Sequence, residues 1–334
     1  MARHRRMLVL LGLVSAAALL CLTSAARAQP SADQVLADFG VSAEDKQRVL
    51  NGEFVTADAS TVSDRDLAVS LVFLVKTSPD ALSKQIMAGN LVTADSQVQS
   101  FGALKSPGSL EDLAGLQISA DEAKALSSAQ AGGALNLAKS EMAAFNAVPG
   151  GAQQAIRQQL RQMLLARYQA YRASGLAGIL PYARGGGSDS DLASDLRKAS
   201  QAAKGLEKYL PKFQAVLLGY PQATVPGMQE NFLWIKYNIQ GKPTYVLQHV
   251  LAAADGAARA VVQRQYYAST GYNGEQAVAG FLPVQGGTIV VYSSHAFTDQ
   301  VAGFGGSMKR GIGSRVMAGQ LKKMFESGRT KIGQ

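Results

Sequence analysis

The chain has few of the side chains that hold metals or form disulfides. It contains one cysteine, Cys21, and three histidines, of which His4 stands at the start of the chain. A disulfide takes two cysteines, and a structural zinc site usually takes four cysteine or histidine ligands. These counts exclude a disulfide framework and a cysteine-based zinc site and nearly exclude a multi-histidine metal site. We therefore expect no metal and no cofactor.

Charged residues and long apolar runs are also scarce. Charged residues make up 17% of the chain and apolar residues 47%, whereas a disordered chain combines low hydrophobicity with high net charge. The one long apolar run is at the N-terminus, which excludes a protein that crosses a membrane several times.

The N-terminus has the three parts of a secretory signal peptide. Arginines at positions 3, 5 and 6 precede the apolar run Met7–Leu22, and the small-residue pattern Ala26-Arg27-Ala28 follows it. This order is typical of a signal that is removed on export. We expect cleavage after Ala28 and a periplasmic or secreted protein whose mature chain has no cysteine.

Two alternatives to cleavage are less favoured. A membrane anchor would have to cross the hydrocarbon core with about 16 apolar residues, which is short for a thickness of ~30 Å. A lipoprotein would be acylated at Cys21, but such signals have a small residue before the cysteine, and here that residue is Leu20.

Basic residues gather in the last quarter of the chain. Residues 29–255 contain 20 basic and 21 acidic side chains, whereas residues 256–334 contain nine basic and three acidic ones. An exported protein has little access to nucleic acid, so any partner of the basic C-terminus is expected to be an anionic membrane, an envelope polymer or an acidic protein. A solvated basic helix face is the favoured alternative.

Local signals in the first part of the chain predict helices and one buried strand. Short helices are expected over residues 31–50. The apolar run Leu67–Val75 predicts a buried strand, and Ser78-Pro79-Asp80 after it predicts a capped helix. Apolar residues at helical spacing over 150–220 predict a helical pair, whose second stripe is expected to end at Pro211.

Beyond the helical region the pattern changes to strands. Apolar and polar residues alternate from Ile235 to Gln240, and turn signals occur at Gly241-Lys242-Pro243, Asn273-Gly274 and Gly286-Gly287. They predict an antiparallel meander of about five strands. An amphipathic helix is expected to follow from Met308 to Phe325.

The fold class that these elements predict is α+β, with an antiparallel sheet wrapped on a long C-terminal helix and with a helical insertion. After the signal peptide at 1–28 we expect an N-terminal helical segment at 29–60. One domain at 61–334 is expected to follow and to carry the insertion at about 150–220.

Two segments resemble parts of the START-like, or helix-grip (SRPBCC-type), superfamily. Leu67–Lys76 followed by Ser78-Pro79-Asp80 is similar to the first strand and proline-started helix of that fold. The meander ending at Tyr292 and the helix Met308–Phe325 are similar to its closing half. The resemblance implies a cavity between the sheet and the C-terminal helix that often holds a lipid or another apolar ligand.

Three short pieces also resemble a family of uncharacterised exported bacterial proteins. They are Leu135-Asn136-Leu137, Arg167–Arg172 and Tyr266–Ser269. This second resemblance implies no function.

Catalytic signals are few. The sequence lacks the common nucleophile-elbow, zinc-protease and phosphate-binding motifs. The best catalytic candidates are His295 after Ser294, with Asp299 nearby, and His249 as an alternative base. A triad needs the serine oxygen near the imidazole, but adjacent residues on a strand point to opposite faces, so Ser294 and His295 would not meet.

Aromatic residues give the stronger signal for a ligand site. Fifteen of the 23 aromatic residues follow residue 200, and Tyr and Trp suit the mouth of an apolar pocket. Ordinary sheet composition is the alternative, since strands favour aromatic residues. The candidate ligand-binding residues are Trp234, Tyr245, His249, Tyr267 and Tyr292.

Strand alternation predicts which of these residues share a face. Tyr245 and His249 are expected on one face of their strand, and Val261 and Tyr267 on one face of the next. The sequence leaves open which face is inward.

The C-terminal helix has an apolar stripe beside basic residues. Such a stripe at the end of an α+β domain usually packs into the core, and contact with a membrane is the alternative. The stripe comprises Met308, Ile312, Val316, Leu321, Met324 and Phe325, and the basic residues near it are Lys309, Arg310, Arg315, Lys322 and Lys323.

These observations favour an exported protein that binds or carries an apolar ligand, such as a lipid, in a cavity between sheet and helix. A structural or interaction protein of the cell envelope, with its cavity filled by its own side chains, is the second hypothesis. A hydrolase is the third.

Overall fold

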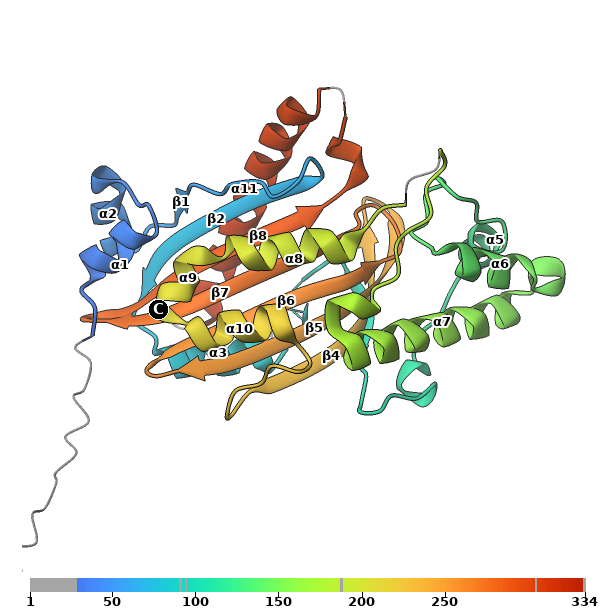
Figure 1. Cartoon of the computed structure of the whole chain (residues 1–334), viewed down its shortest axis with the longest axis horizontal. Coiled ribbons are helices and arrows are strands. Elements are labelled where there is room, and N and C mark those ends of the chain that lie inside the picture. Colours follow the sequence, from blue (N-terminus) through green and yellow to red (C-terminus); the bar gives the residue numbers. More distant parts are fainter. Residues whose placement is uncertain (1–28, 90–91, 94, 187–188, 304, 333–334) are drawn as a thin grey trace, which may run out of the picture.

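The structure, a computed structural model, describes residues 29–89, 92–93, 95–186, 189–303 and 305–332. The expected signal peptide lies outside these residues. At the centre is an antiparallel sheet of eight strands (Figure 1). The strands are β1 (Val55–Ala57), β2 (Asp66–Val75), β3 (Val98–Ala103), β4 (Gln229–Ile239), β5 (Lys242–Asp255), β6 (Ala258–Ala268), β7 (Gly274–Val284) and β8 (Gly287–Phe297).

The strand order is β1-β2-β8-β7-β6-β5-β4-β3. The five strands from β4 to β8 form a meander in which each pairs with the next, as the turn signals predict. The first long strand, β2, lies beside the last, from Asp66 opposite Phe297 to Val75 opposite Thr288. The sheet is therefore assembled from both ends of the described chain.

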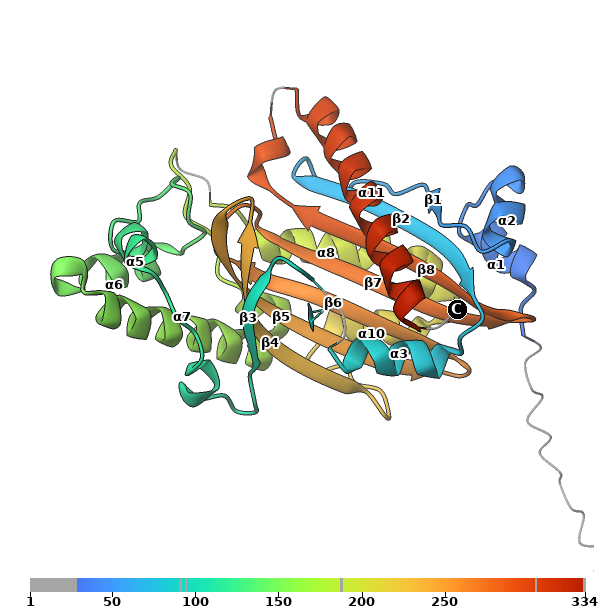
Figure 2. The ribbon, with the colours of Figure 1, turned by 180° about the vertical axis from the view of Figure 1, so that it is seen from behind.

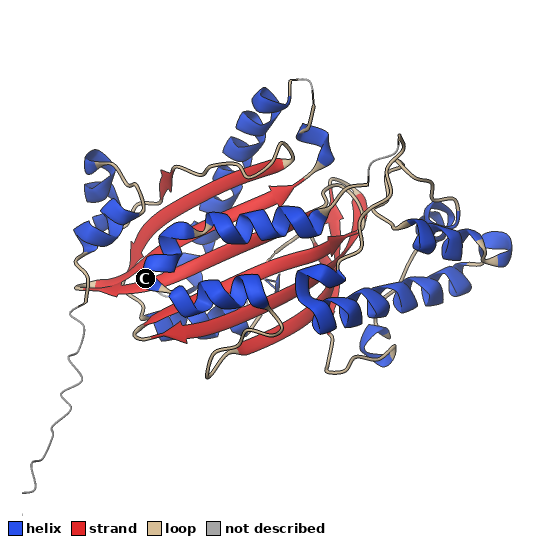
Figure 3. Ribbon diagram, viewed as in Figure 1, coloured by secondary structure: helices blue, strands red, loops and turns tan. Residues whose placement is uncertain are grey.

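Helices cover both faces of the sheet. The end of α7 and the helices α8 to α10 lie on one face (Figure 1), and α3 and α11 lie on the other (Figure 2). The helices, shown in blue in Figure 3, are α1 (Ala32–Asp38), α2 (Ala43–Leu50), α3 (Pro79–Met87), α5 (Ala120–Ser127), α6 (Lys139–Asn146), α7 (Gln153–Ser174), α8 (Leu192–Ala202), α9 (Lys204–Tyr209), α10 (Pro211–Gly219) and α11 (Gly306–Ile332).

The fold class is the expected one: α+β, with an antiparallel sheet, a long C-terminal helix and helices inserted between β3 and β4. The start of α3 also follows its sequence signal, because the Ser78 hydroxyl accepts a hydrogen bond from the Ala81 amide and Pro79 is the first helical residue. None of the helices that the structure describes combines the length and apolar character needed to span a lipid bilayer.

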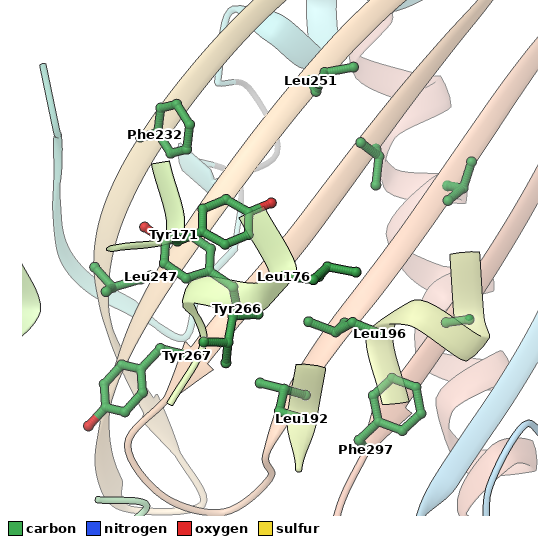
Figure 4. Close-up of a cluster of buried hydrophobic side chains, with 14 of the residues drawn as sticks. Tyr171, Leu176, Leu192, Leu196, Phe232, Leu247, Leu251, Tyr266, Tyr267 and Phe297 are labelled. Atoms are coloured by element: carbon green, nitrogen blue, oxygen red, sulfur yellow. The ribbon is translucent and has the colours of Figure 1, made fainter. Parts of the chain in front are cut away.

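The face under the inserted helices is packed mainly with aromatic and aliphatic side chains (Figure 4). Tyr171 of α7 stacks on Tyr266 of β6 with ring centroids 4.0 Å apart and planes 7° apart. Leu192 and Leu196 of α8 are fully buried in the same cluster. This packing holds the insertion to the sheet, since each buried leucine contributes roughly 2 kcal/mol.

Rings fill the space between the sheet and α11. Phe73 of β2 lies with its ring centroid 4.6 Å from that of Phe54 and 5.2 Å from that of Phe325 of α11. The Phe325 ring also meets Tyr292 of β8 edge-on, with centroids 5.1 Å apart. The contact between sheet and C-terminal helix is thus made by side chains of the protein itself.

Two local expectations are wrong. Val261 and Tyr267 lie on opposite faces, because a β-bulge at Tyr266 places Tyr266 and Tyr267 together under the inserted helices. Pro211 begins α10 rather than closing a longer helix, since proline is well suited to the first helical position.

Candidate functional site

A groove of about 540 Å³ opens at the edge of the sheet between α3 and strands β3 and β4. Its volume is within the range of small-molecule sites. Most of its lining comes from three segments that are far apart in the sequence: the end of α3, the chain from β3 to Ser106, and the start of β4. Arg172 of α7, Val250 of β5 and Gln263 of β6 complete it. We call this space the edge groove.

Most of the lining of the edge groove is apolar. Ile86 and Met87 line it from α3, and Leu233 and Val250 line it from the sheet. Phe101 of β3 also lines it and is 45% exposed. The groove therefore offers an apolar surface that is open to the solvent at β3.

One part of the groove is charged. Arg172 of α7 and Glu230 of β4 both line it, with Nη2 of Arg172 3.7 Å from Oε1 of Glu230. The Arg172 guanidinium also receives support from Tyr168, whose hydroxyl accepts from Nη1 at 3.3 Å and donates to the Lys105 carbonyl at 2.8 Å. The side chain of Lys105 is exposed beside them.

A chain of polar contacts runs from Glu230 into the core. Oε2 of Glu230 lies 3.4 Å from Nε2 of His249, and Nδ1 of His249 lies 3.2 Å from the Tyr171 hydroxyl. Arg264 donates to the same hydroxyl at 3.1 Å. A carboxylate only accepts, so a neutral imidazole places its proton on Nε2, facing Glu230, and Nδ1 then accepts from the Tyr171 hydroxyl.

The protonation states follow from burial and from these contacts. Burial lowers the pKa of His249 to about 4, although the nearby Glu230 carboxylate acts in the opposite direction. The close approach of His249 in turn lowers the pKa of Glu230. At pH 7 the pair is therefore a neutral imidazole beside a carboxylate, and Arg172 neutralises that carboxylate.

Of the ligand-binding candidates from the sequence, His249 lies behind the polar end of the edge groove. Trp234 is buried and donates from Nε1 to the Asp112 carbonyl at 2.8 Å. Tyr245 donates to Glu122, and Tyr267 lies 4.3 Å below the Arg167 guanidinium. Tyr292 packs against α11 on the other face. These five residues do not meet at one place.

The catalytic candidates are also separate. Nδ1 of His295 lies 2.8 Å from Oδ2 of the buried Asp66, whereas Ser294 donates to Oε1 of Glu275 at 2.6 Å on the opposite face of β8. Asp299 instead pairs with Arg184 at 2.8 Å. A serine-histidine-aspartate triad is not assembled from Ser294, His295 and Asp299.

The residues that give the groove its positive charge and its exposed apolar surface could not be identified from the sequence. Arg172 lies in one of the short family-like pieces, which imply no function, and Phe101 and Lys105 carry no local signal. The part of the chain that the structure describes has no group of three or more His, Cys, Asp or Glu side chains that could hold a metal ion.

Comparisons with family models, with curated proteins and with solved structures found no match for this chain. The START-like resemblance stays a prediction, and the residues of the edge groove are the basis for a function.

Proposed function

We propose that this protein binds or carries a small amphipathic molecule in the edge groove. The observation that carries the proposal is the pairing of an apolar, ligand-sized groove with one charged end. Ligand sites in proteins are usually of this kind, with apolar walls and a few polar groups that fix the orientation. The apolar body of the ligand would lie along Phe101, Leu233 and Val250.

The charges at the polar end favour an anionic head group. Arg172 and Lys105 are positive, Glu230 is negative, and His249 is neutral at pH 7, so the fixed charges sum to +1. A carboxylate or phosphate head could pair with the Arg172 guanidinium, which suits such groups by its planar array of donors. A fatty acid or a lipid with a single negative charge has the required chemistry.

The START-like resemblance implies a ligand cavity at a different place, between the sheet and the C-terminal helix. None of the residues that line the edge groove is on α11, so the proposal rests on the groove and not on the resemblance. We further propose that the protein is exported, on the strength of the signal-peptide pattern at residues 1–28.

A pair of fluorescent probes tests the groove directly. Anilinonaphthalene sulfonate has an apolar ring system with an anionic sulfonate, and N-phenyl-1-naphthylamine has the same rings without it. We expect Ala103→Trp, which places an indole in the groove, to weaken binding of both probes about ten-fold or more. Gln99→Trp, on the same strand but outside the lining, is the matched control and should bind as the wild type does.

Arg172→Gln distinguishes the contribution of the ligand's anionic head group to binding from that of its apolar body. It should weaken binding of the sulfonate probe about ten-fold, which corresponds to roughly 1.4 kcal/mol, and leave binding of the uncharged probe unchanged. Cooperative unfolding of each variant must be checked, because loosely packed states bind these dyes. Equal binding of both probes to wild type and Ala103→Trp would rule the groove out.

One observation favours a second function. The rings of Phe54, Phe73 and Phe325 fill the space beneath α11, as expected of an envelope interaction protein that takes no ligand. Folded wild-type protein that binds neither probe would favour this alternative.

A further inference from the structure

Helix α11 has two apolar faces, and only one of them is packed. Met317, Leu321 and Phe325 pack against the buried cluster on the sheet. Met308 is 74% exposed, and Ile312 and Val316 are each 56% exposed. The apolar stripe of the sequence is therefore divided between the core and the solvent.

The exposed residues form one line along the helix. Met308, Ile312 and Val316 are four positions apart, which places them above one another on a single face. Large apolar side chains are seldom this exposed elsewhere in the molecule: of the seven such exposed residues among those described, four are on α11. The seven are Phe101, Leu180, Leu218, Met308, Ile312, Val316 and Met324.

Cations border this line. Lys309, Arg315 and Lys323 are exposed on the same helix, and we call them, with Met308, Ile312 and Val316, the outward face of α11. From residue 306 to the end, the sequence has seven basic residues and one acidic residue, Glu326.

Another basic residue of the helix has a structural role. Arg310 donates from Nη1 to the Asp64 carbonyl at 2.8 Å, and so ties the start of α11 to the chain before β2. This contact holds the helix in place with its outward face turned away from the sheet.

We propose that the outward face of α11 docks on the surface of an anionic lipid membrane. The helix lies across the outer side of the sheet (Figure 2). A ridge of apolar side chains bordered by cations fits the boundary between anionic head groups and acyl chains. The net positive charge of the segment selects an anionic surface over a neutral one.

Docking in this way would also turn the edge groove toward the lipid. Phe101, exposed at the groove, projects from the sheet face that carries α3 and α11, as shown by its place beside Val250 in the groove lining. The docking proposal rests on α11 alone and stands or falls independently of the ligand.

Vesicle flotation tests the proposal with protein purified after expression of the full chain. We expect binding to vesicles of equal parts phosphatidylglycerol and phosphatidylcholine at low salt, and weak binding to vesicles of phosphatidylcholine alone. High salt should reduce the binding, because it screens exposed charges. Met308→Ser, Ile312→Ser and Val316→Ser combined should weaken binding to the mixed vesicles at least about ten-fold.

Matched variants keep the result specific. Leu180→Ser with Leu218→Ser removes exposed apolar side chains from the inserted segment and should leave vesicle binding unchanged. A second comparison uses two triple variants. Removing three positive charges from the outward face should weaken vesicle binding, whereas removing three from the inserted helices should leave it unchanged. The outward set is Lys309→Gln, Arg315→Gln and Lys323→Gln, and the control set is Lys124→Gln, Lys139→Gln and Lys212→Gln.

Two results would overturn the proposal. One is the absence of binding to the mixed vesicles at low salt, which is also what a helix that docks on an acidic protein would give. The other is equal loss of vesicle binding in the outward and control variants.

Discussion

At the scale of single residues, the polar end of the edge groove depends on burial as much as on charge. His249 is 2% exposed and lies against the ring of Phe232, with centroids 4.2 Å apart. An imidazolium at this position would lose most of its hydration, and the neighbouring Glu230 does not fully compensate. The histidine therefore acts as a neutral bridge between Glu230 and Tyr171.

The pH dependence of stability follows from this state. His249 has a pKa of about 4 in the folded protein against 6.5 in the unfolded chain, so between these values the unfolded chain binds more protons. The stability that the neutral histidine contributes is present above pH 6.5 and is lost as the pH falls toward 4. The expected loss at pH 5 is about 2 kcal/mol.

Urea unfolding of wild type and His249→Gln at pH 7 and pH 5 measures this contribution. The other carboxylates are common to both proteins, so the difference between the two pH effects reports His249 together with Glu230, whose pKa it lowers. The wild type should lose about 2 kcal/mol more than the variant does. An identical pH effect in both would show that His249 is not held neutral.

Residue types could be predicted from the sequence better than their partners. His249 stands out because histidines are few and because it lies on an apolar strand. Its contacts could not be foreseen, since Tyr171 and Glu230 reach it from α7 and β4, across 78 and 19 residues of chain. Arg172 was missed for the same reason, because only the fold brings it to Glu230.

At the scale of elements, two glycines of α11 show how closely this helix packs on the sheet. A Cβ atom added at Gly313 would lie 2.8 Å from a methyl carbon of Leu67 on β2, whereas one added at Gly319 would meet nothing within 4 Å. Both glycines are inside the helix, where alanine is favoured by about 1 kcal/mol.

The two glycines should therefore respond in opposite directions. Gly319→Ala is expected to raise the free energy of unfolding by about 0.5–1 kcal/mol, since it gains helix propensity without a clash. Gly313→Ala is expected to lower it by about 1 kcal/mol, because Leu67 must shift. Urea unfolding together with hydrogen exchange of the α11 amides measures both, and equal effects would contradict this packing of α11 on β2.

Elements with local signals were predicted well. The Ser78-Pro79 cap starts α3, and the Gly-containing turns separate the strands of the meander. The bulge at Tyr266 depends on packing and leaves no mark in the local pattern. The four-residue spacing of Met308, Ile312 and Val316 does mark a second apolar face of α11, but the sequence does not show that this face is left uncovered. The spacing of apolar residues predicts that a helix has an apolar face, but it does not predict what packs against that face.

At the scale of the whole molecule, the two sides of the sheet differ in what they do. The inserted helices bury one face under Tyr171, Leu192 and Leu196. The other face carries α3, the edge groove and α11 with its outward apolar line. The apolar part of the edge groove thus lies on the same side as the outward face of α11, while its charged end, with Arg172 of α7 and Glu230, lies at the sheet edge toward the inserted helices.

The position of the edge groove in the fold could not be predicted from the sequence. Its walls come from residues near 86, 101 and 231, and more than 120 residues of inserted chain separate the last two. The general expectation of an apolar site on a sheet with aromatic residues came from composition. The position of the site depends on where β3 ends. Its pairing with β4 stops at Ala103 opposite Leu233, so β3 does not cover the start of β4.

Mass spectrometry of organic extracts from wild type and Ala103→Trp, purified in parallel from their native cells, tests the central claim most directly. We expect one amphipathic species with an anionic head, bound in stoichiometric amount to the wild type and missing from the variant. A clean extract from folded wild-type protein, or the same bound species in both proteins, would contradict it.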